Sequence, residues 1–456
     1  MASRFLIAAA HKSSGKTVIA TGLAAAFAAL GENVQTFKKG PDYIDPMWLA
    51  AASGRPCYNL DFNTMGRDEL VRLFAARGPN ADIALIEANK GLFDGMDVNG
   101  SDSNAEMAKL LSAPVFLVID TTGMTRGIAP LLQGYAAFDK DVHIAGVILN
   151  KVGGARHESK LRAAVEAYCD MPVVGAVWRN PDLAIGERHL GLTTPAETGQ
   201  FDAMIKSIGT IVGNSVDLSA IKTLSNVASV GLVKRPQILP RPQPDVKIGI
   251  AQDIAFGFYY PDDLEAFANA GATLVPIDTL NDTALPAIDG LFIGGGFPET
   301  QMAGLQKNAA LRSDIRQAIS GGLPTYAECG GLMYLCKSLC WHGETFDMVG
   351  AINGDAVMHD RPKGRGYARF TNRPDHPWGR GGETVKAHEF HYASIENLPD
   401  TSSFGRTVLR GAGIDGAQDA VIVKNLVAGF CHLRNSAENP WVSDFVNFVR
   451  SRKNPA

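Results

Sequence analysis

The chain contains few cysteines and no long apolar segment. Its six cysteines among 456 residues are scattered, with no repeated Cys-x-x-Cys pair, which favours reduced thiols in a cytoplasm over a disulfide framework. No run of about eighteen apolar residues occurs, and the apolar residues 5–10 are too few for a signal sequence. A net charge of -4 at pH 7 provides no basic stripe for general nucleic-acid binding. Disulfide-rich, membrane-spanning and nucleic-acid-binding proteins are therefore not expected.

Length and proline distribution indicate how the chain is divided. A chain of 456 residues is longer than one ordinary hydrophobic core supports, so two or three domains are expected. Between residues 230 and 245 the hydrophobic periodicity is lost and prolines gather, which is typical of a stiff linker. We therefore predict one domain over residues 1–229, a linker over residues 230–245 and a second domain over residues 246–451.

The first domain opens with a phosphate-binding pattern. An apolar strand at residues 5–10 leads through a loop of small and basic residues into Gly15-Lys16-Thr17 and an Ala-rich helix at residues 18–30. Backbone N–H groups of such a loop cradle phosphates, the lysine reaches the outer phosphates, and the threonine hydroxyl binds Mg²⁺. The first glycine of the usual pattern is replaced by Ala10. The predicted nucleotide-binding residues are Lys12, Ser13, Ser14, Gly15, Lys16 and Thr17.

Acidic residues follow two further strands of this domain. The strand at residues 83–86 ends in Glu87, and an acid at the end of a buried strand in a P-loop sheet is where Mg²⁺ is held. Asp42 and Asp45 follow the strand at residues 33–37, and flanking prolines and aromatics indicate that they are held in place. Asp94, in a glycine-flanked loop, could reach the same metal or the transferred phosphate.

Later strands of the first half, at residues 115–120, 145–150 and 173–177, alternate with helical segments. Near-continuous apolar strands with intervening helices predict a parallel sheet covered on both faces. Asn150 and Lys151, at the end of one strand, lie where nucleotide bases are often recognised. Residues 187–192 are polar and loop-like, and their chemistry indicates no role.

The second domain is organised around Cys329. A strand at residues 323–327 runs into Cys329-Gly330-Gly331 and a predicted helix at residues 332–339. A cysteine at a helix N-terminus is favoured as a thiolate, and the glycines allow a sharp turn and close approach of a substrate carbonyl. The alternative is a buried structural cysteine.

Other residues of the second domain offer partners for that thiol. The triglycine at residues 294–296 can present N–H groups to an oxyanion, and His432, at another strand end, is the best candidate base. The cluster at residues 388–391 is a rival that could bind metal, assist chemistry or serve structure. Cys336 and Cys340, on one face of the predicted helix, could also ligate metal, although two ligands alone are a weak signal.

These motifs resemble those of known families. The segment around Cys329, the triglycine and His432 resemble a class I, triad-type glutamine amidotransferase domain, and Ser14-Gly15-Lys16-Thr17 resembles the dethiobiotin synthetase-like P-loop fold. Their fusion resembles the cobyrinic acid a,c-diamide synthase family. Further stretches typical of that family are residues 40–46, 187–192 and 388–392. The resemblance implies an α/β protein of two domains, each a mainly parallel sheet covered by helices, the first P-loop NTPase-like and the second flavodoxin-like.

The resemblance also implies an activity, a glutamine-hydrolysing, ADP-forming amidoligase of cobalamin biosynthesis. Its expected substrates are L-glutamine, ATP with Mg²⁺, and a tetrapyrrole polycarboxylic acid amidated on its a and c acetates through an acyl phosphate. It assigns nucleophile and base to Cys329 and His432, oxyanion contacts to Gly295 and Gly330, metal ligation to Thr17, Asp42 and Glu87, and substrate or intermediate contacts to Asp45 and Asp94. A cytoplasmic location is expected, and a homodimer is left open.

Two departures from the pattern bear on mechanism and substrate. Class I triads carry Glu two residues after the histidine, whereas this chain has Arg434, so the group orienting His432 is unidentified and a Cys329–His432 dyad is expected. Residues 57–65 resemble family forms of sulfur metabolism, which favours siroheme or another sirohydrochlorin derivative as a second candidate substrate. A cobyric acid synthase relative and a P-loop regulatory ATPase with a non-catalytic amidotransferase-like module are also compatible with these motifs.

Overall fold

The computed structural model describes residues 3–78, 81–188, 191–193, 201–226 and 241–453. The chain forms two compact units, Met1–Gln237 and Ile238–Ala456. Residues 230–240 of the predicted linker lie outside the described residues. Among the described residues, no helix has both the length and the apolar character needed to cross a lipid bilayer.

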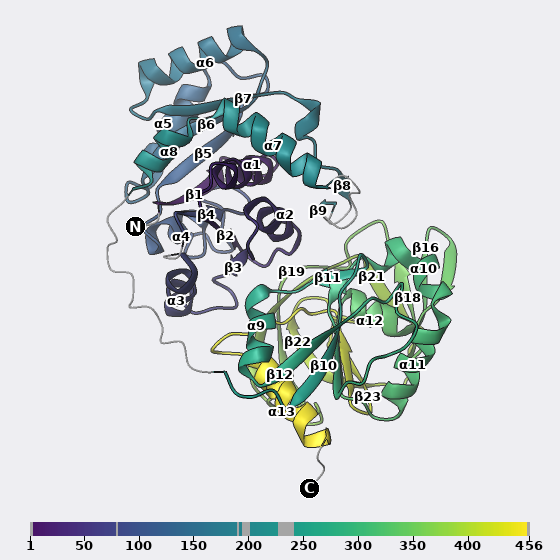
Figure 1. Ribbon diagram of the computed structural model, residues 1–456. Coiled ribbons are helices and arrows are strands. Elements are labelled where there is room, and N and C mark those ends of the chain that lie inside the picture. The colour runs from purple at the N-terminus through teal and green to yellow at the C-terminus, as the bar shows by residue number, and fades with distance from the viewer. Residues whose placement is uncertain (1–2, 79–80, 189–190, 194–200, 227–240, 454–456) are drawn as a thin grey trace. The chain divides into compact units, whose positions relative to one another are not determined.

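The first unit contains a seven-stranded parallel sheet in the order β3-β2-β4-β1-β5-β6-β7, with helices along its faces (Figure 1). Buried strands such as β4 and β5 are near-continuous apolar runs, as predicted, whereas the equally buried β2 carries four polar residues. The strands are β1 Ser3–Ala9, β2 Val34–Lys39, β3 Tyr58–Leu60, β4 Ile83–Glu87, β5 Val115–Asp120, β6 Ile144–Val152 and β7 Val173–Trp178. The helices are α1 Lys16–Ala29, α2 Ile44–Ser53, α3 Arg67–Arg77, α4 Asn104–Leu110, α5 Ile128–Phe138, α6 Ala155–Tyr168, α7 Phe201–Ser215 and α8 Leu218–Leu224.

Close packing of α1 places the phosphate loop. Phe5 of β1 lies between Phe27 of α1 and Phe116 of β5, with ring centroids 6.4 and 5.5 Å away. On its other side α1 packs against α7, where a Cβ atom on Gly22 would come within 2.5 Å of the Val212 side chain. The glycine thus permits a helix approach that a larger residue would block. Residues 187–192, expected to be a loop, include the short paired strands β8 Glu187–Arg188 and β9 Gly191–Leu192.

The second unit is built on a nine-stranded sheet in the order β12-β10-β13-β15-β24-β23-β22-β19-β20. The first five strands pair in parallel and the last four continue the sheet antiparallel. The parallel strands are β10 Val246–Ala251, β12 Ala272–Ile277, β13 Gly290–Ile293, β15 Thr325–Glu328 and β24 Leu426–Gly429. The antiparallel strands are β19 Gly364–Asn372, β20 Thr384–His391, β22 Ser403–Arg410 and β23 Gln418–Val423. The two-domain α/β architecture is confirmed, and the antiparallel extension is an addition to it.

Smaller elements complete this unit (Figure 1). The helices are α9 Pro261–Asn269, α10 Met302–Lys307, α11 Ala309–Ser320, α12 Gly330–Leu335 and α13 Trp441–Lys453. The short strands β11 Phe256–Phe258 and β14 Gly295–Gly296 pair with each other. A four-stranded sheet contains β16 Cys336–Trp341, β17 Glu344–Asp347, β18 Ile352–Met358 and β21 Ala393–Glu396.

The helix predicted over residues 332–339 is wrong in its second half. Helix α12 ends at Leu335, and Cys336–Trp341 is the strand β16, paired with β17 and β18. Cys336 is buried, Lys337 exposed and Ser338 buried again, which is the alternation of a strand. Four residues along a strand span about 13 Å, so Cys336 and Cys340 are too far apart to share a metal ion.

Candidate functional site

The predicted P-loop connects β1 to α1 in a shape that its own hydrogen bonds maintain. Gly15 has φ 87°, and a Cβ atom there would lie 2.3 Å from Nδ2 of Asn150. Asn150 uses this nitrogen to donate to the Ser14 carbonyl oxygen at 2.8 Å, so only glycine fits. The Ser14 hydroxyl donates to the His11 carbonyl oxygen at 2.8 Å. Lys12 and Ser13 are exposed on the same loop.

Lys16 and Thr17 begin α1 beside the carboxyl ends of β2 and β4. The Thr17 hydroxyl donates to Oε1 of Glu87 at 2.7 Å. Burial and then the Lys38 ammonium lower the pKa of Lys16 to about 8, while Glu87, Asp45 and Asp94 oppose that shift. The structure therefore brings the P-loop lysine close to three acids predicted from widely separated segments.

Lys38, the penultimate residue of β2, is a buried lysine to which the sequence pattern assigned no role. Its Nζ lies 2.5 Å from Oδ2 of Asp45 and 3.0 Å from Oε1 of Glu87, with 2% of the side chain exposed. Burial lowers the pKa of Lys38, but these two carboxylates outweigh burial and raise it above its usual range. The sequence signal that could have identified Lys38 is its position near the end of a strand predicted to be buried, where a lysine needs acidic partners.

The other acids near the carboxyl ends of β2 and β4 are Asp42, Asp45 and Asp94, and each is held by different partners. Oδ1 of Asp42 accepts the N–H groups of Ile44 and Asp45, at 2.9 and 3.0 Å, at the start of α2. Burial and the neighbouring Asp45 raise the pKa of Asp42 to about 6. Asp94 is exposed, and its Oδ2 accepts the Gly91 N–H at 2.8 Å. Asp42 is thus partly occupied by the backbone, whereas Asp45 is held through Lys38.

The donor set at Thr17 and Glu87 fits Mg²⁺. Oε2 of Glu87 is buried and has no hydrogen-bond partner among the described residues. Burial raises the pKa of Glu87 to about 7, and the Lys38 ammonium, 3.0 Å from Oε1, opposes that shift. The described ranges hold no group of three or more His, Cys, Asp or Glu residues placed for a metal ion. Mg²⁺ in phosphate sites uses one or two carboxylates with substrate phosphates, so a hydroxyl and a carboxylate suffice.

A cavity of about 410 Å³ adjoins the P-loop beside the ends of β6 and β7. Asn150 and Lys151 line it together with Gly15, Val18 and residues between Trp178 and Ala184, among which Arg179 and Asn180 are polar. Nζ of Lys151 lies 2.8 Å from Oδ2 of Asp120. Because Asn150 donates to the loop and Lys151 pairs with Asp120, the two side chains shape the cavity wall beside Trp178, Pro181 and Leu183. Recognition of a nucleotide base by Asn150 and Lys151 stays a prediction.

Cys329 lies at a strained turn between β15 and α12. Its backbone has φ 48° and ψ −103°, a conformation that costs a non-glycine residue about 1–3 kcal/mol. The thiol is nearly buried, and the Cys329 N–H donates to the Gly429 carbonyl oxygen at 2.8 Å. Strain of this kind at a strand-to-helix turn is a feature of nucleophiles in α/β enzymes.

The glycines around the turn allow two loops to meet. A Cβ atom on Gly331 would lie 2.3 Å from the Ile293 carbonyl oxygen, and one on Gly330 would lie 3.0 Å from the Gly296 nitrogen. The triglycine loop therefore packs directly on the cysteine turn, as the oxyanion prediction requires. A Cβ atom on Gly295 would lie 2.6 Å from Cε1 of His432, so this glycine also contacts the predicted base.

His432 is 2% exposed and faces Cys329. Burial lowers its pKa, but hydrogen bonds with Cys329 and Glu328 outweigh burial and raise the pKa to about 10. Its Nδ1 lies 3.3 Å from Oε2 of Glu328, a residue to which the sequence pattern gave no role. Arg434, two residues after the histidine, instead donates to Oδ2 of Asp262 at 2.6 Å.

The histidines at 388 and 391 do not form the metal site that their spacing left open. On strand β20 they point to opposite faces. The His388 ring stacks on His432, with ring centroids 4.9 Å apart, while His391 stacks on Phe430 at 3.7 Å. Nδ1 of His391 lies 2.8 Å from the Ala393 carbonyl oxygen. His388 thus supports the predicted base, and His391 is a packed core residue.

Comparison with known proteins covers both halves of the chain. Residues 5–192 match the family model described as the CobQ/CobB/MinD/ParA nucleotide binding domain, and residues 247–440 match the CobB/CobQ-like glutamine amidotransferase domain. A cobyrinate a,c-diamide synthase of Magnetococcus marinus is 42% identical over 455 residues, which cover 98% of this chain and 97% of that protein. The enzymes of the same name from Methanosarcina barkeri and Dehalococcoides mccartyi are each 37% identical, covering 98% and 99% of this chain and 96% and 98% of theirs.

Proposed function

The chain belongs to the cobyrinate a,c-diamide synthase family, and on that premise we propose that it is a glutamine-hydrolysing amidoligase acting on a modified tetrapyrrole. ATP activates the a and c acetate carboxylates, and ammonia from glutamine converts each into an amide. The observation that carries the proposal is Cys329, held in a strained turn against His432 and the triglycine loop.

Glutamine hydrolysis uses the second unit. The Cys329 thiol gives its proton to Nε2 of His432, and the thiolate attacks the side-chain carbonyl carbon of glutamine. Backbone N–H groups at Gly295 and Gly330 stabilise the oxyanion. The imidazolium then returns the proton to the leaving nitrogen, ammonia departs, and water hydrolyses the thioester to glutamate. The raised pKa of His432 favours the imidazolium that forms in these reaction steps.

Carboxylate activation uses the first unit. A substrate carboxylate is a poor electrophile, so its oxygen attacks the γ-phosphorus of ATP, ADP leaves, and an acyl phosphate forms. Ammonia attacks the acyl carbon and phosphate departs. Lys16 and Lys38 neutralise phosphate charge, Asp45 and Asp94 orient the substrate or intermediate, and Lys12, Ser13, Ser14 and Gly15 hold the phosphates. Mg²⁺ bound by Thr17, Glu87 and Asp42 would supply further charge neutralisation on the phosphates.

The family comparison also bears on the substrate. Full-length relatives carry the name cobyrinate a,c-diamide synthase, which favours cobyrinate or hydrogenobyrinate over the siroheme derivative suggested by residues 57–65. The same comparison disfavours the alternative of a P-loop regulatory ATPase with a non-catalytic amidotransferase-like module. We place the reaction in the cytoplasm, where ATP and glutamine are available.

The proposal is tested by separating the two nitrogen sources. Cys329→Ala should abolish amidation with glutamine but keep it with added ammonium, while the matched Cys340→Ala variant should keep both. Lys16→Ala should stop amidation from either source and spare glutamine hydrolysis. Glutamate, ADP and diamide are measured with cobyrinate as acceptor. Equal loss of both activities in a folded Cys329→Ala protein would overturn the assignment.

A further inference from the structure

The carboxylate of Glu328 is enclosed directly beside His432. Oε2 lies 3.3 Å from Nδ1 of His432, and 3% of each side chain is exposed. Oε1 accepts the Tyr326 hydroxyl at 2.7 Å and the Leu433 N–H at 2.8 Å. Three donors therefore fix one carboxylate, and one of them is the backbone of the residue following His432. The backbone segment that carries His432 therefore also anchors the carboxylate.

Strand geometry explains how one segment supplies both nucleophile and acid. Successive residues of β15 alternate between its faces, so Tyr326 and Glu328 lie on the same face. At Cys329 the backbone turns with φ 48°, and the thiol hydrogen-bonds with the same imidazole that Glu328 contacts. Because Nδ1 faces Glu328, Nε2 is the ring nitrogen left for Cys329. The histidine is thus held between two consecutive residues of the chain.

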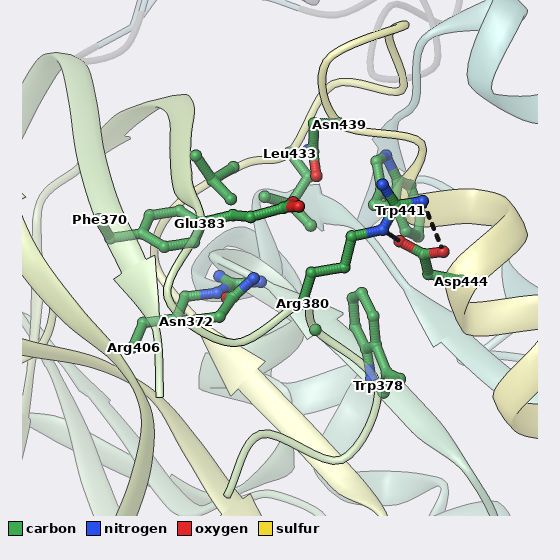
Figure 2. A pocket seen from close by; sticks show the side chains of 12 residues that line it. Phe370, Asn372, Trp378, Arg380, Glu383, Arg406, Leu433, Asn439, Trp441 and Asp444 are labelled. Carbon is green, nitrogen blue, oxygen red and sulfur yellow. Dashed lines mark hydrogen bonds and ion pairs between the residues drawn. The ribbon is translucent and has the colours of Figure 1, made fainter. Parts of the chain in front are cut away.

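A buried arginine supports this arrangement from behind. Nη2 of Arg406 donates to the Tyr326 hydroxyl oxygen at 3.3 Å, and Nη1 lies 3.4 Å from Oδ2 of Asp419. Figure 2 shows Arg406 beside Asn372 at one side of a cavity, with Trp378 at the other side. The cavity holds about 10 Å³, room for no more than one water, so it cannot admit glutamine. Asp419, Arg406, Tyr326 and Glu328 form one chain of contacts that ends at His432.

Other groups around His432 do not replace Glu328. The His388 ring stacks on the imidazole face at a centroid distance of 4.9 Å, which limits tilting but offers no carboxylate at Nδ1. Arg434, at the position where class I enzymes carry the acid, is paired with Asp262 on α9. Among the described residues, the titratable groups that contact His432 include Cys329 and Glu328 from the β15 end and His388 from β20.

We propose that Glu328 is the positioning residue of the amidotransferase site, so that the site is a Cys329–His432–Glu328 triad whose acid precedes the nucleophile. The proposal rests on the proposed function. Glu328 keeps the Nδ1 proton in place, which leaves Nε2 to take the thiol proton, and it stabilises the imidazolium that results. This role deepens the expected dyad into a three-residue site.

The test compares Glu328→Gln, Glu328→Asp and the matched control Glu389→Gln. Glu389 is also a buried carboxylate of this unit, but its oxygens accept the N–H groups of Ala412 and Gly413. Glu328→Gln should lower the kcat of glutamine hydrolysis by about 10²- to 10⁴-fold with little change in KM, as wrong-tautomer variants do. Glu328→Asp should restore part of the rate, and Glu389→Gln should change kcat little.

A second readout separates positioning from mere structure. The rate of Cys329 alkylation by iodoacetamide is followed against pH, and its apparent pKa should rise by about one unit or more in Glu328→Gln. Ammonium-dependent amidation should be unchanged. If Glu328→Gln does not fold, Tyr326→Phe, which removes one donor to Glu328, should still lower kcat about tenfold. If Glu328→Gln keeps a near-normal kcat and an unshifted pH profile of alkylation, while Cys329→Ala is inactive with glutamine, only this inference is overturned. If Cys329→Ala still hydrolyses glutamine, the proposed function is overturned.

Discussion

Replacement of Gly295 by alanine tests the contact between the triglycine loop and His432. The added Cβ atom would lie 2.6 Å from Cε1 of His432 and 3.2 Å from the Phe258 ring, whereas ordinary contacts begin at 3.4 Å. The imidazole must therefore retreat by about 0.8 Å, the difference between 3.4 and 2.6 Å. A misplacement of about 1 Å at a reacting group can cost about 10²-fold in rate, so glutamine hydrolysis should slow by that order. Alanine keeps the backbone N–H, so the loss would come from His432 and not from the oxyanion contact.

The assay measures glutaminase kcat and ammonium-dependent amidation of the same Gly295→Ala protein. Amidation from ammonium should persist, because the first unit is untouched. Overpacking should destabilise the second unit by about 1–3 kcal/mol, which thermal unfolding would register. Gly381→Ala is the matched control, since its Cβ atom would come no closer than 3.7 Å to a neighbour and φ there is not positive. A kcat within threefold (about 0.7 kcal/mol) of the parent would refute the placement of His432 against Gly295.

Two further predictions concern buried charges. Lys38→Met should leave Asp45 and Glu87 without their cation, abolish amidation from either nitrogen source, spare glutamine hydrolysis and cost about 3–5 kcal/mol of unfolding free energy, measured by denaturant titration. His376 should make stability depend on pH, because burial and then Arg406 lower its pKa to about 3 and the folded state resists its protonation. Its contribution is complete above about pH 6.5 and is lost by up to about 1.4 kcal/mol per unit as pH falls toward 3. His376→Asn should flatten that acid slope, and an unchanged slope would contradict the assignment.

Local sequence patterns were sufficient for features that depend on a single strand-to-helix connection. The P-loop at Gly15 and the turn at Cys329 each combine an apolar strand, small residues and a helix start, so backbone requirements alone reveal them. The parallel order of strands followed from alternating apolar strands and helices. The antiparallel strands of the second sheet did not, because half-exposed strands such as β22 carry polar residues that also suit loops.

Features created by contacts between distant segments were not readable in this way. Lys38 reads as one of two lysines in a charged stretch, and only the convergence of Asp45 and Glu87 around its Nζ reveals a buried ion pair. Residues 336–341 continue the apolar pattern of α12, and pairing with β17 and β18 turns them into a strand. In both cases the partner lies outside the local window, so tertiary contact overrides local preference.

Glu328 shows why a familiar spacing can mislead about chemistry. A triad acid is usually sought after the histidine, but the chemistry requires only that a carboxylate oxygen reach Nδ1 while the thiol reaches Nε2. Adjacent residues of a regular strand point to opposite faces, so Glu328 and Cys329 could not meet one imidazole from a continuous β15. The positive φ at Cys329 ends the strand between them and redirects the thiol. The strain at the nucleophile therefore has a second consequence: it lets the acid be supplied from the preceding residue, which leaves position 434 free for an arginine that anchors α9 through Asp262.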